Sequence, residues 1–237
     1  MQPSLKKRFW TDAKAAAFGD AWEILLDDRR VMTPAKSHLL LPNAALAEAV
    51  AAEWQAQEGD VMPATMPMTR RANAALDKVA VQHAEVADML AEYAASDLLC
   101  HRAASPQELV ARQAAAWDPL LDWIAKRYDA PLVVTEGVMP AAQPADSLSR
   151  LRQSVHGYDN FALTALHDLV TLPGSLVIGL AASSGEFDAG KLWRASQVDE
   201  DWQAGLWGID EEAAQNSRNR AEGFSQALRF LALVRGG

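Results

Sequence analysis

Cysteine, long hydrophobic runs and positive charge are all scarce in this chain of 237 residues. Its one cysteine, Cys100, excludes an internal disulfide and a zinc site built on several thiolates, and it fits a reducing compartment. The longest apolar run, near residues 176–182, is far shorter than the ~18–20 residues that cross a bilayer. No apolar stretch follows the basic residues near the N-terminus, so we expect no secretory signal and a cytosolic location.

The charge balance excludes further classes of partner. The chain has 22 Lys and Arg residues against 31 Asp and Glu residues, a formal net charge of −9. Such a chain repels the phosphates of nucleic acids and the anionic surface of a membrane, and we expect neither as a partner. Half of the residues are apolar, and the length allows one large domain or two small ones with a real core.

The beginning of the chain has the pattern of β-strands. Apolar side chains alternate with others over residues 22–26, and residues 27–30 resemble a tight turn. Two further extended runs follow at residues 31–33 and 38–41. This pattern predicts a small antiparallel meander.

The remainder of the chain has the periodicity of helices. After Asn43, a good N-cap residue, apolar residues recur every three to four positions, and further helices are predicted over 69–79 and around 86–93. We therefore expect a mixed α/β N-terminal domain over residues 1–80 and a helical domain over residues 81–237.

Short polar motifs predict where several later helices begin. Ser105 and Glu108 have the spacing of a capping box, with Pro106 at the first helical position. Three aspartates precede apolar helical patterns and are expected to cap them: Asp159, Asp188 and Asp210. The helix that begins after Asp188 is predicted to continue through Trp202.

Residues that could carry chemistry are few and poorly arranged. Residues 185–191 match the spacing of a phosphate-binding loop through Lys191, but Leu192 stands where magnesium needs a Ser or Thr, so an interhelical loop is expected. His167 and Asp168 are adjacent, and neighbours on a helix do not face each other, which argues against a ready-made dyad. Cys100 lies in an apolar run and is expected in the core.

Two acidic clusters lie beside tryptophans. Asp199, Glu200 and Asp201 precede Trp202, and Trp207 precedes a second cluster over residues 210–212. Consecutive carboxylates diverge around a helix, so they make a poor acid–base pair. Acids beside tryptophans do suit a docking surface with aromatic anchors, although a solvated helix face with core tryptophans fits the same pattern.

Nine segments of the sequence resemble one family, the ATP12-type assembly chaperones for the alpha subunit of the F1 ATP synthase. They occur in the family's order and cover nearly the whole chain. The segments are KRFW (7–10), TPAK (33–36), EWQ (53–55), PMTR (67–70), DLLC (97–100), RQAAAWDPLLDW (112–123), TEG (135–137), LHDLVTLPGSLVIGL (166–180) and VDEDWQAGLWG (198–208). Without a transit peptide, the chain resembles a bacterial member of that family.

The resemblance implies an α+β fold, with a small mixed α/β N-terminal domain followed by an orthogonal helical bundle. It also implies a chaperone with no enzymatic activity and no cofactor. Such a chaperone holds the unassembled alpha subunit, at its nucleotide-binding domain, until a beta subunit replaces it. We expect a monomer in the free state, since a surface meant for a transient partner does not require a second copy.

The resemblance further implies that an acidic residue between Val198 and Gln203 takes part in binding. Asp199, Glu200 and Asp201 are the candidates, of which we favour Glu200, with Trp202 and Trp207 as apolar contacts. Two alternatives stay open: a hydrolase that uses His167 and nearby acids, and an adaptor for another protein.

Overall fold

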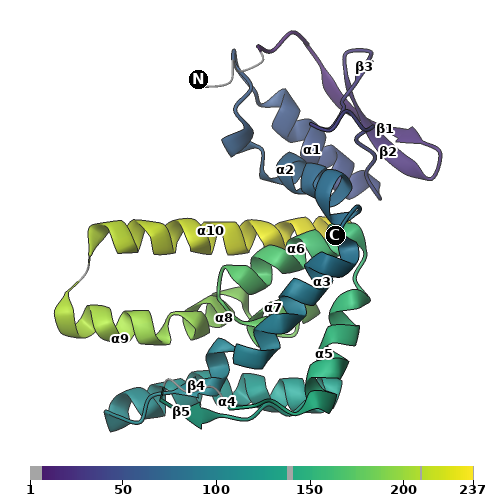
Figure 1. Cartoon of the computed structure of the whole chain (residues 1–237). Coiled ribbons are helices and arrows are strands. Elements are labelled where there is room, and N and C mark those ends of the chain that lie inside the picture. Colours follow the sequence, from purple (N-terminus) through teal and green to yellow (C-terminus); the bar gives the residue numbers. More distant parts are fainter. Residues whose placement is uncertain (1–6, 138–140, 209, 237) are drawn as a thin grey trace. The chain divides into compact units, whose positions relative to one another are not determined.

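The computed structural model describes residues 7–137, 141–208 and 210–236, and it combines small sheets with many helices (Figure 1). The α+β class predicted from the sequence is confirmed. The chain forms two compact units. Unit 1 consists of residues 1–83, 159–165 and 229–237, and unit 2 of residues 84–158 and 166–228. A domain division at residue 80 stays a prediction, because unit 1 also draws two segments from the second half of the chain.

Unit 1 contains an antiparallel sheet of three strands in the order β1-β2-β3. The strands are β1 (Ala13–Phe18), β2 (Ala21–Leu26) and β3 (Arg29–Arg30). The predicted strand over 22–26 is confirmed, whereas the runs over 31–33 and 38–41 make the single bridges Met32–His38 and Trp22–Leu41. The sequence pattern does not predict β1, because its alanines favour helix and its pairing with β2 comes from the tertiary fold.

The turn between β2 and β3 is held by one aspartate. Asp27 adopts a left-handed backbone with φ of 54°, a conformation that Asp tolerates better than most residues. Its Oδ1 accepts hydrogen bonds from the backbone N–H groups of Asp12 (2.9 Å) and Thr11 (3.0 Å). These hydrogen bonds hold the pKa of the Asp27 carboxyl below its usual value.

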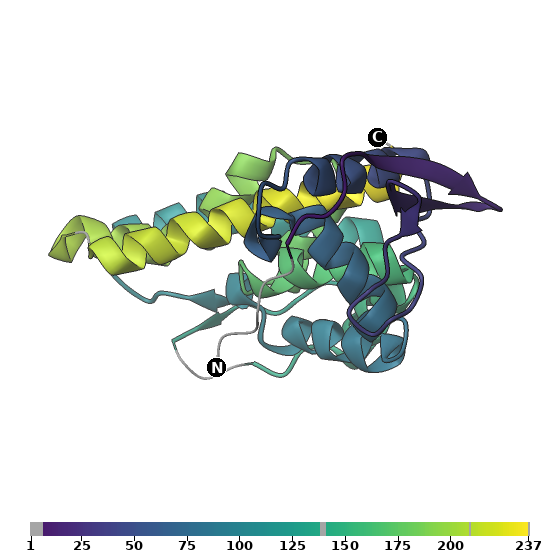
Figure 2. The same ribbon diagram turned by 90° about the horizontal axis from the view of Figure 1, so that it is seen from above.

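Helix α1 (Ala44–Gln55) lies against β1 and β2 (Figure 2). The predicted cap is confirmed, because Asn43 Oδ1 accepts a hydrogen bond of 2.9 Å from Leu46 N. The Nδ2 atom of the same Asn43 side chain donates hydrogen bonds to the carbonyl oxygens of Leu233 and Val234, the last residues of α10 (Glu211–Val234). One side chain thus satisfies the start of one helix and the end of another.

The second helical segment of unit 1 begins earlier than predicted. A short 3-10 turn η1 (Pro63–Thr65) leads into α2 (Pro67–Ala74), which continues as a π-helical turn η2 (Ala75–Val79). The first turn of α2 is satisfied by Glu53 of α1, whose carboxylate accepts hydrogen bonds from Met68 N (2.7 Å) and Thr69 N (2.8 Å). This distant carboxylate replaces a local N-cap residue, which explains why no local motif marks the start at Pro67.

The described part of unit 2 is helical apart from one small sheet. The following elements lie wholly or partly in unit 2: α3 (His83–Glu92), η3 (Tyr93–Ser96), η4 (Leu98–Cys100), β4 (His101–Arg102), α4 (Gln107–Tyr128), β5 (Thr135–Glu136), α5 (Ala145–His156), α6 (Asn160–Thr171), α7 (Leu176–Ser184), α8 (Ala189–Ser196), α9 (Val198–Trp207) and α10. Strands β4 and β5 pair in parallel. Every residue of α7 from Leu176 to Ser183 is buried, so α7 lies at the centre of the unit's core.

A buried carboxylate ties the start of α7 to the segment that follows α3. Asp97 is 0% exposed and accepts hydrogen bonds from Ser175 Oγ (2.7 Å), Val177 N (3.1 Å) and Leu99 N (3.1 Å). Burial raises the pKa of Asp97 above its ordinary value, and the three hydrogen bonds oppose that rise. The carboxylate of Asp97 therefore has hydrogen-bond partners within the core, as buried polar groups nearly always do.

Two predicted helix boundaries in unit 2 are wrong. No capping box forms at Ser105, because α4 begins at Gln107 with Pro106 in the extended N-cap position and no side-chain cap. The helix expected from Asp188 through Trp202 is broken at Gln197 into α8 and α9. The three aspartate caps are confirmed, because each carboxylate accepts a hydrogen bond from a backbone N–H of its own helix: Asp159 from Ala162, Asp188 from Lys191 and Asp210 from Ala213.

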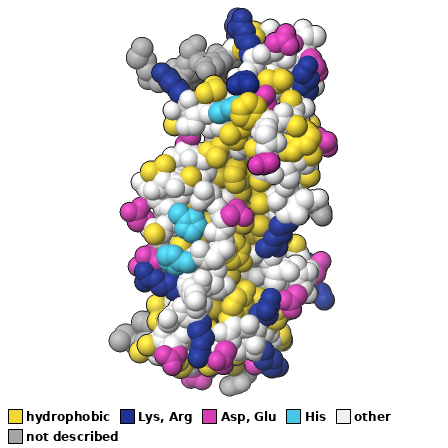
Figure 3. Space-filling model, turned by 90° about the vertical axis from the view of Figure 1, so that its right-hand side faces the viewer, with side chains coloured by type: hydrophobic (Ala, Val, Ile, Leu, Met, Phe, Trp, Pro, Cys, Tyr) yellow, Lys and Arg dark blue, Asp and Glu magenta, His cyan; other side chains and the backbone are white. Residues whose placement is uncertain are grey.

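The surface carries charges of both signs. On the face shown in Figure 3, basic and acidic side chains are scattered among hydrophobic ones. More than half of the accessible surface of an ordinary folded protein comes from apolar atoms, so an apolar side chain at the surface needs no special explanation by itself. Large apolar side chains that are mostly exposed to solvent are more informative. Helix α9 carries two of them, Leu206 and Trp207.

Candidate docking surface

Helix α9 is held at a sharp bend after α8. Gln197 lies between the two helices and is 5% exposed. Its side-chain Oε1 accepts a hydrogen bond of 2.7 Å from Ser217 Oγ of α10, and its backbone carbonyl accepts one of 2.8 Å from Asp201 N. This buried amide fixes the direction in which α9 leaves the core of unit 2.

The three acidic residues of α9 have different environments. Asp199 is half-buried and accepts a hydrogen bond of 2.6 Å from Gln113 Nε2 of α4, so it fastens α9 to α4. Glu200 is exposed, with its Oε1 at 3.2 Å from the guanidinium of Arg220 of α10. Asp201 is exposed. The divergence expected from their spacing is therefore present, and all three suit the positive end of the helix dipole.

The two tryptophans of α9 also differ. Trp202 is half-buried, and the guanidinium of Arg112 lies over its ring at 4.9 Å from the centroid, a cation–π arrangement that holds the ring against α4. Trp207 is 86% exposed and the neighbouring Leu206 is 60% exposed. A tryptophan is on average a well-buried residue, so a nearly free indole at a helix end indicates a surface made for contact.

Four residues of α9 with exposed side chains are called the α9 surface below: Glu200, Asp201, Leu206 and Trp207. Glu200 and Trp207 are seven residues apart, which places them on one face of the helix, about 10 Å apart along its axis. The sequence pattern identifies Trp207 and the acids, but it does not identify Leu206. The sequence signal that could have revealed Leu206 is that it directly precedes Trp207 at the end of the helix.

The second acidic cluster does not form part of the α9 surface as a unit. Asp210 is used as a helix cap, since its Oδ1 accepts a hydrogen bond of 3.0 Å from Ala213 N. Glu211 and Glu212 are exposed in the first turn of α10. Their charges favour the helix dipole, which is a sufficient structural reason for their presence.

The candidate catalytic residues do not build a recognisable centre. Contrary to the expectation from helix spacing, His167 Nδ1 and Asp168 Oδ1 lie 3.1 Å apart. The His167 side chain is 44% exposed and not in the apolar core. Cys100 is buried as expected, and burial raises its pKa to about 12, which leaves the thiol protonated and unreactive.

The interhelical loop expected over residues 185–191 is confirmed. Gly185 ends α7 with φ of 74°, and Asp188 caps α8 through a hydrogen bond of 2.8 Å from the backbone N–H of Lys191. Glu186 accepts a hydrogen bond of 3.0 Å from Trp123 Nε1. Residues 185–191 are therefore a turn between two helices, and a carboxylate occupies the N–H group of Lys191 at the start of α8.

The described residues form neither a cluster of metal ligands nor a membrane-spanning helix. In residues 7–137, 141–208 and 210–236, no group of three or more His, Cys, Asp and Glu side chains could hold a metal ion. Within the same ranges, no helix has the length and apolar character needed to cross a membrane. What the described part of unit 2 does offer is an exposed apolar end of α9 that includes a tryptophan, a residue type enriched in protein-binding surfaces.

Comparison with known proteins assigns the chain to a class of protein-binding proteins. A family model described as ATP12 chaperone protein matches residues 7–125. The chain therefore belongs to the ATP12 chaperone family, and it is a chaperone of the class that serves ATP synthase assembly.

Solved structures agree with this assignment over almost the whole chain. The crystal structure of Atp12 from Paracoccus denitrificans is 47% identical with a TM-score of 0.94, and the match covers 97% of this chain and 98% of that one. A variant of the Paracoccus protein, in which one aspartate is replaced by lysine, is 46% identical over the same shares with a TM-score of 0.94. A candidate chaperone from Agrobacterium tumefaciens is 38% identical with a TM-score of 0.91, covering 96% of this chain and 86% of that one.

Proposed function

We propose that this chaperone binds the unassembled alpha subunit of the F1 ATP synthase and covers its subunit interface until a beta subunit takes its place. An orphan alpha subunit exposes apolar surface and strand edges that would otherwise be buried against beta, and such surfaces aggregate. We place this action in the bacterial cytoplasm, and we propose that it requires neither catalysis nor a cofactor.

The observation that carries the proposal is the exposed end of α9. Leu206 and Trp207 are 60% and 86% exposed, and the exposed carboxylates of Glu200 and Asp201 lie about two turns earlier on the same helix. Exposed tryptophans are the strongest single anchors in protein interfaces, and neighbouring charges choose the partner and speed its approach. A contact surface of this modest size can be displaced by the larger interface of an obligate partner subunit.

The partner implied by this chemistry has a basic patch beside an apolar pocket. Glu200 is already paired with Arg220, but both side chains are substantially exposed, at 53% and 37%. An exposed pair of this kind contributes about 0–1 kcal/mol to stability. Glu200 can therefore exchange Arg220 for an arginine or lysine of the alpha subunit without a large folding penalty.

The test is light scattering during dilution of the same organism's alpha subunit from denaturant. We expect the wild-type chaperone to suppress scattering near stoichiometric amounts and to form a one-to-one complex that a beta subunit displaces. Glu200→Lys should weaken the complex and reduce the dependence of its Kd on salt, because it replaces attraction by repulsion. The matched control is Glu48→Lys, which makes the same charge change at an exposed position of α1.

The apolar anchor is tested separately. Trp207→Ala should raise the Kd of the complex about thirtyfold, the effect of losing ~2 kcal/mol at an interface anchor. Val81→Ala is the control, because Val81 is also well exposed, at 75%, but lies outside α9. If Glu200→Lys and Trp207→Ala both bind like wild type, the α9 surface is the wrong site. If the wild-type chain neither suppresses scattering nor forms a complex, the alpha subunit is not its client.

A further inference from the structure

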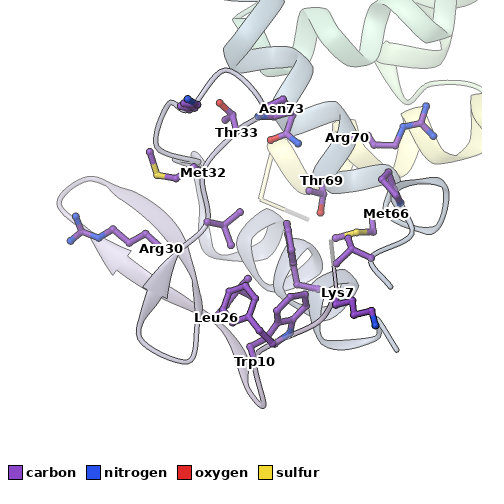
Figure 4. A pocket seen from close by; sticks show the side chains of 17 residues that line it. Lys7, Trp10, Leu26, Arg30, Met32, Thr33, Met66, Thr69, Arg70 and Asn73 are labelled. Atoms are coloured by element: carbon purple, nitrogen blue, oxygen red, sulfur yellow. The ribbon is translucent and has the colours of Figure 1, made fainter. Parts of the chain in front are cut away.

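Unit 1 contains an open cavity of about 780 Å³ between its sheet and its helices (Figure 4). This volume lies within the range of about 300–1,000 Å³ that is typical of ligand sites. The floor consists of buried side chains, chiefly Trp10, Leu26, Val31 and Met66. No residue of the α9 surface lines this cavity, so it is a separate feature of the molecule.

The walls are held open by two carboxylates that do not line the cavity. Asp77 of η2 accepts hydrogen bonds from Thr33 Oγ1 (2.6 Å) and Ala35 N (2.9 Å), which fixes the segment after β3. Glu53 holds the first turn of α2 and also accepts a hydrogen bond of 2.7 Å from Thr69 Oγ1. A cavity with tethered walls is pre-organised, which lowers the entropy cost of binding.

Four cationic side chains lie at the rim, although the whole chain is acidic. Lys7, Arg30, Lys36 and Arg70 line the cavity and are exposed, while none of the 17 lining residues is an aspartate or glutamate. Arg30 is paired with Glu23 at 2.9 Å. Among the described residues, no carboxylate lies within salt-bridge distance of Lys7, Lys36 or Arg70, so these three charges are available to a ligand.

Three enclosed polar atoms of lining side chains have no partner within the described part of the chain. They are Trp10 Nε1, Trp54 Nε1 and Asn73 Oδ1, two donors and one acceptor. Buried polar groups are nearly always hydrogen-bonded, and each such exception needs an explanation. These atoms are enclosed by neighbouring side chains, so a ligand reaches them only when those side chains move aside. A bound polypeptide then supplies the missing groups, because every residue of it offers one carbonyl acceptor and one N–H donor. A fatty acyl chain supplies neither.

We propose that this cavity is a second docking site, which binds an extended polypeptide segment with apolar side chains in its centre and carboxylates beside them. The apolar side chains enter the floor beside Trp10, and the carboxylates meet Lys7, Lys36 and Arg70. Phe9 and Met32, exposed at 60% and 49%, extend the apolar surface at the rim. The flexible side chain of Met32 adapts to different apolar partners, which suits a chaperone.

The site deepens the chaperone role but does not depend on the α9 surface. A short fluorescein-labelled peptide with central leucine and phenylalanine residues and aspartates at both ends is the probe, measured by fluorescence anisotropy with the full chain. We expect saturable binding that weakens with salt. The same peptide with lysines at both ends should bind at least about tenfold more weakly, because rim charges govern such contacts.

The location of binding is tested with Arg70→Glu, an exposed change on α2 that should weaken the acidic peptide about tenfold. Lys14→Glu is the matched control, since Lys14 is an exposed residue of β1 outside the cavity. In nitrogen–proton correlation spectra, the indole N–H signals of Trp10 and Trp54 should shift on binding, with Trp10→Phe and Trp54→Phe used for their assignment.

Three results would overturn the proposal. They are equal binding of the acidic and basic peptides, unchanged binding by Arg70→Glu, and peptide binding that leaves both indole signals in place. Palmitate binding without peptide binding would likewise overturn it and assign the cavity to a lipid. Glu200→Lys should leave peptide binding unchanged, so this site can fail while the binding of the alpha subunit through α9 stands.

Discussion

Adding one methyl group at each of two helical glycines should give two variants of clearly different stability. Gly179 lies in the buried helix α7, where an added Cβ would meet Val170 Cγ2 at 2.4 Å and the carbonyl oxygen of Leu169 at 3.1 Å. Gly205 lies in α9, and a Cβ there would meet nothing within 4 Å. Both positions gain the same helix propensity from Gly→Ala, about 1 kcal/mol.

The difference between the two variants therefore isolates the packing of α7 against α6. Ordinary carbon–carbon contacts lie at about 3.5–4.0 Å, so Val170 must move, and the Leu169 carbonyl is part of the helix backbone. Overpacking of a dense core costs about 1–3 kcal/mol. Gly205→Ala should stabilise the protein by about 0.5–1 kcal/mol, and Gly179→Ala should be less stable than Gly205→Ala by about 1–3 kcal/mol.

Urea unfolding followed by circular dichroism measures this difference. A shift of the midpoint at constant m-value reports a change in stability and not a change in the unfolded state. In thermal melts the two variants should differ by about 2–12 °C, given 2–4 °C for each kcal/mol in a chain of this size. Equal stability of Gly179→Ala and Gly205→Ala would show that α6 and α7 are not in close contact at Gly179, and the reasoning would fail.

Three further predictions concern buried or hydrogen-bonded groups. Because burial raises the folded-state pKa of Asp97 above 3.8, its contribution to stability is fully present below that pH and is lost as the pH rises through the folded pKa. Urea unfolding at several pH values should show this downward slope, and Asp97→Asn should remove it. Cys100, whose pKa is raised to about 12, should resist iodoacetamide at pH ~8 in the native protein and react once urea unfolds it, as mass spectrometry can show. Rapid native labelling would contradict its burial. Glu53→Gln should destabilise the protein by about 1–3 kcal/mol, because an amide cannot accept all the hydrogen bonds from Met68 and Thr69. Glu48→Gln, an exposed change on the same helix, should have little effect, and equal effects of the two would refute the role of Glu53.

The candidate site was only partly predictable from the sequence. The acids and tryptophans of residues 199–207 are conspicuous in the sequence, and the structure places Glu200 and Trp207 at the surface. Their separate environments were not predictable, because Asp199 and Trp202 are held by Gln113 and Arg112 of a helix ~80 residues earlier in the chain. No local pattern reveals such partners, since the pairing depends on how α4 and α9 pack together.

The cavity of unit 1 was not predicted at all. Its lining comes from five separate stretches between Lys7 and Asn73, and each stretch by itself resembles an ordinary loop, strand or helix. The feature that makes it a candidate site is the convergence of cations and unpartnered indoles around an apolar floor. Convergence is a property of the packed chain and has no signature in any one segment.

Local chemistry by itself determined the helix starts at Asn43, Asp159, Asp188 and Asp210. In each case the cap and the N–H group it accepts from lie within three residues, so the hydrogen bond forms whenever the segment becomes helical. The local pattern of apolar residues likewise indicated strands followed by helices and the burial of Cys100. Tertiary structure decided the alanine-rich strand β1, the break at Gln197 and the start of α2 at Pro67. Those features depend on hydrogen bonds to β2, to Ser217 and to Glu53, whose positions are set only when distant segments pack against one another.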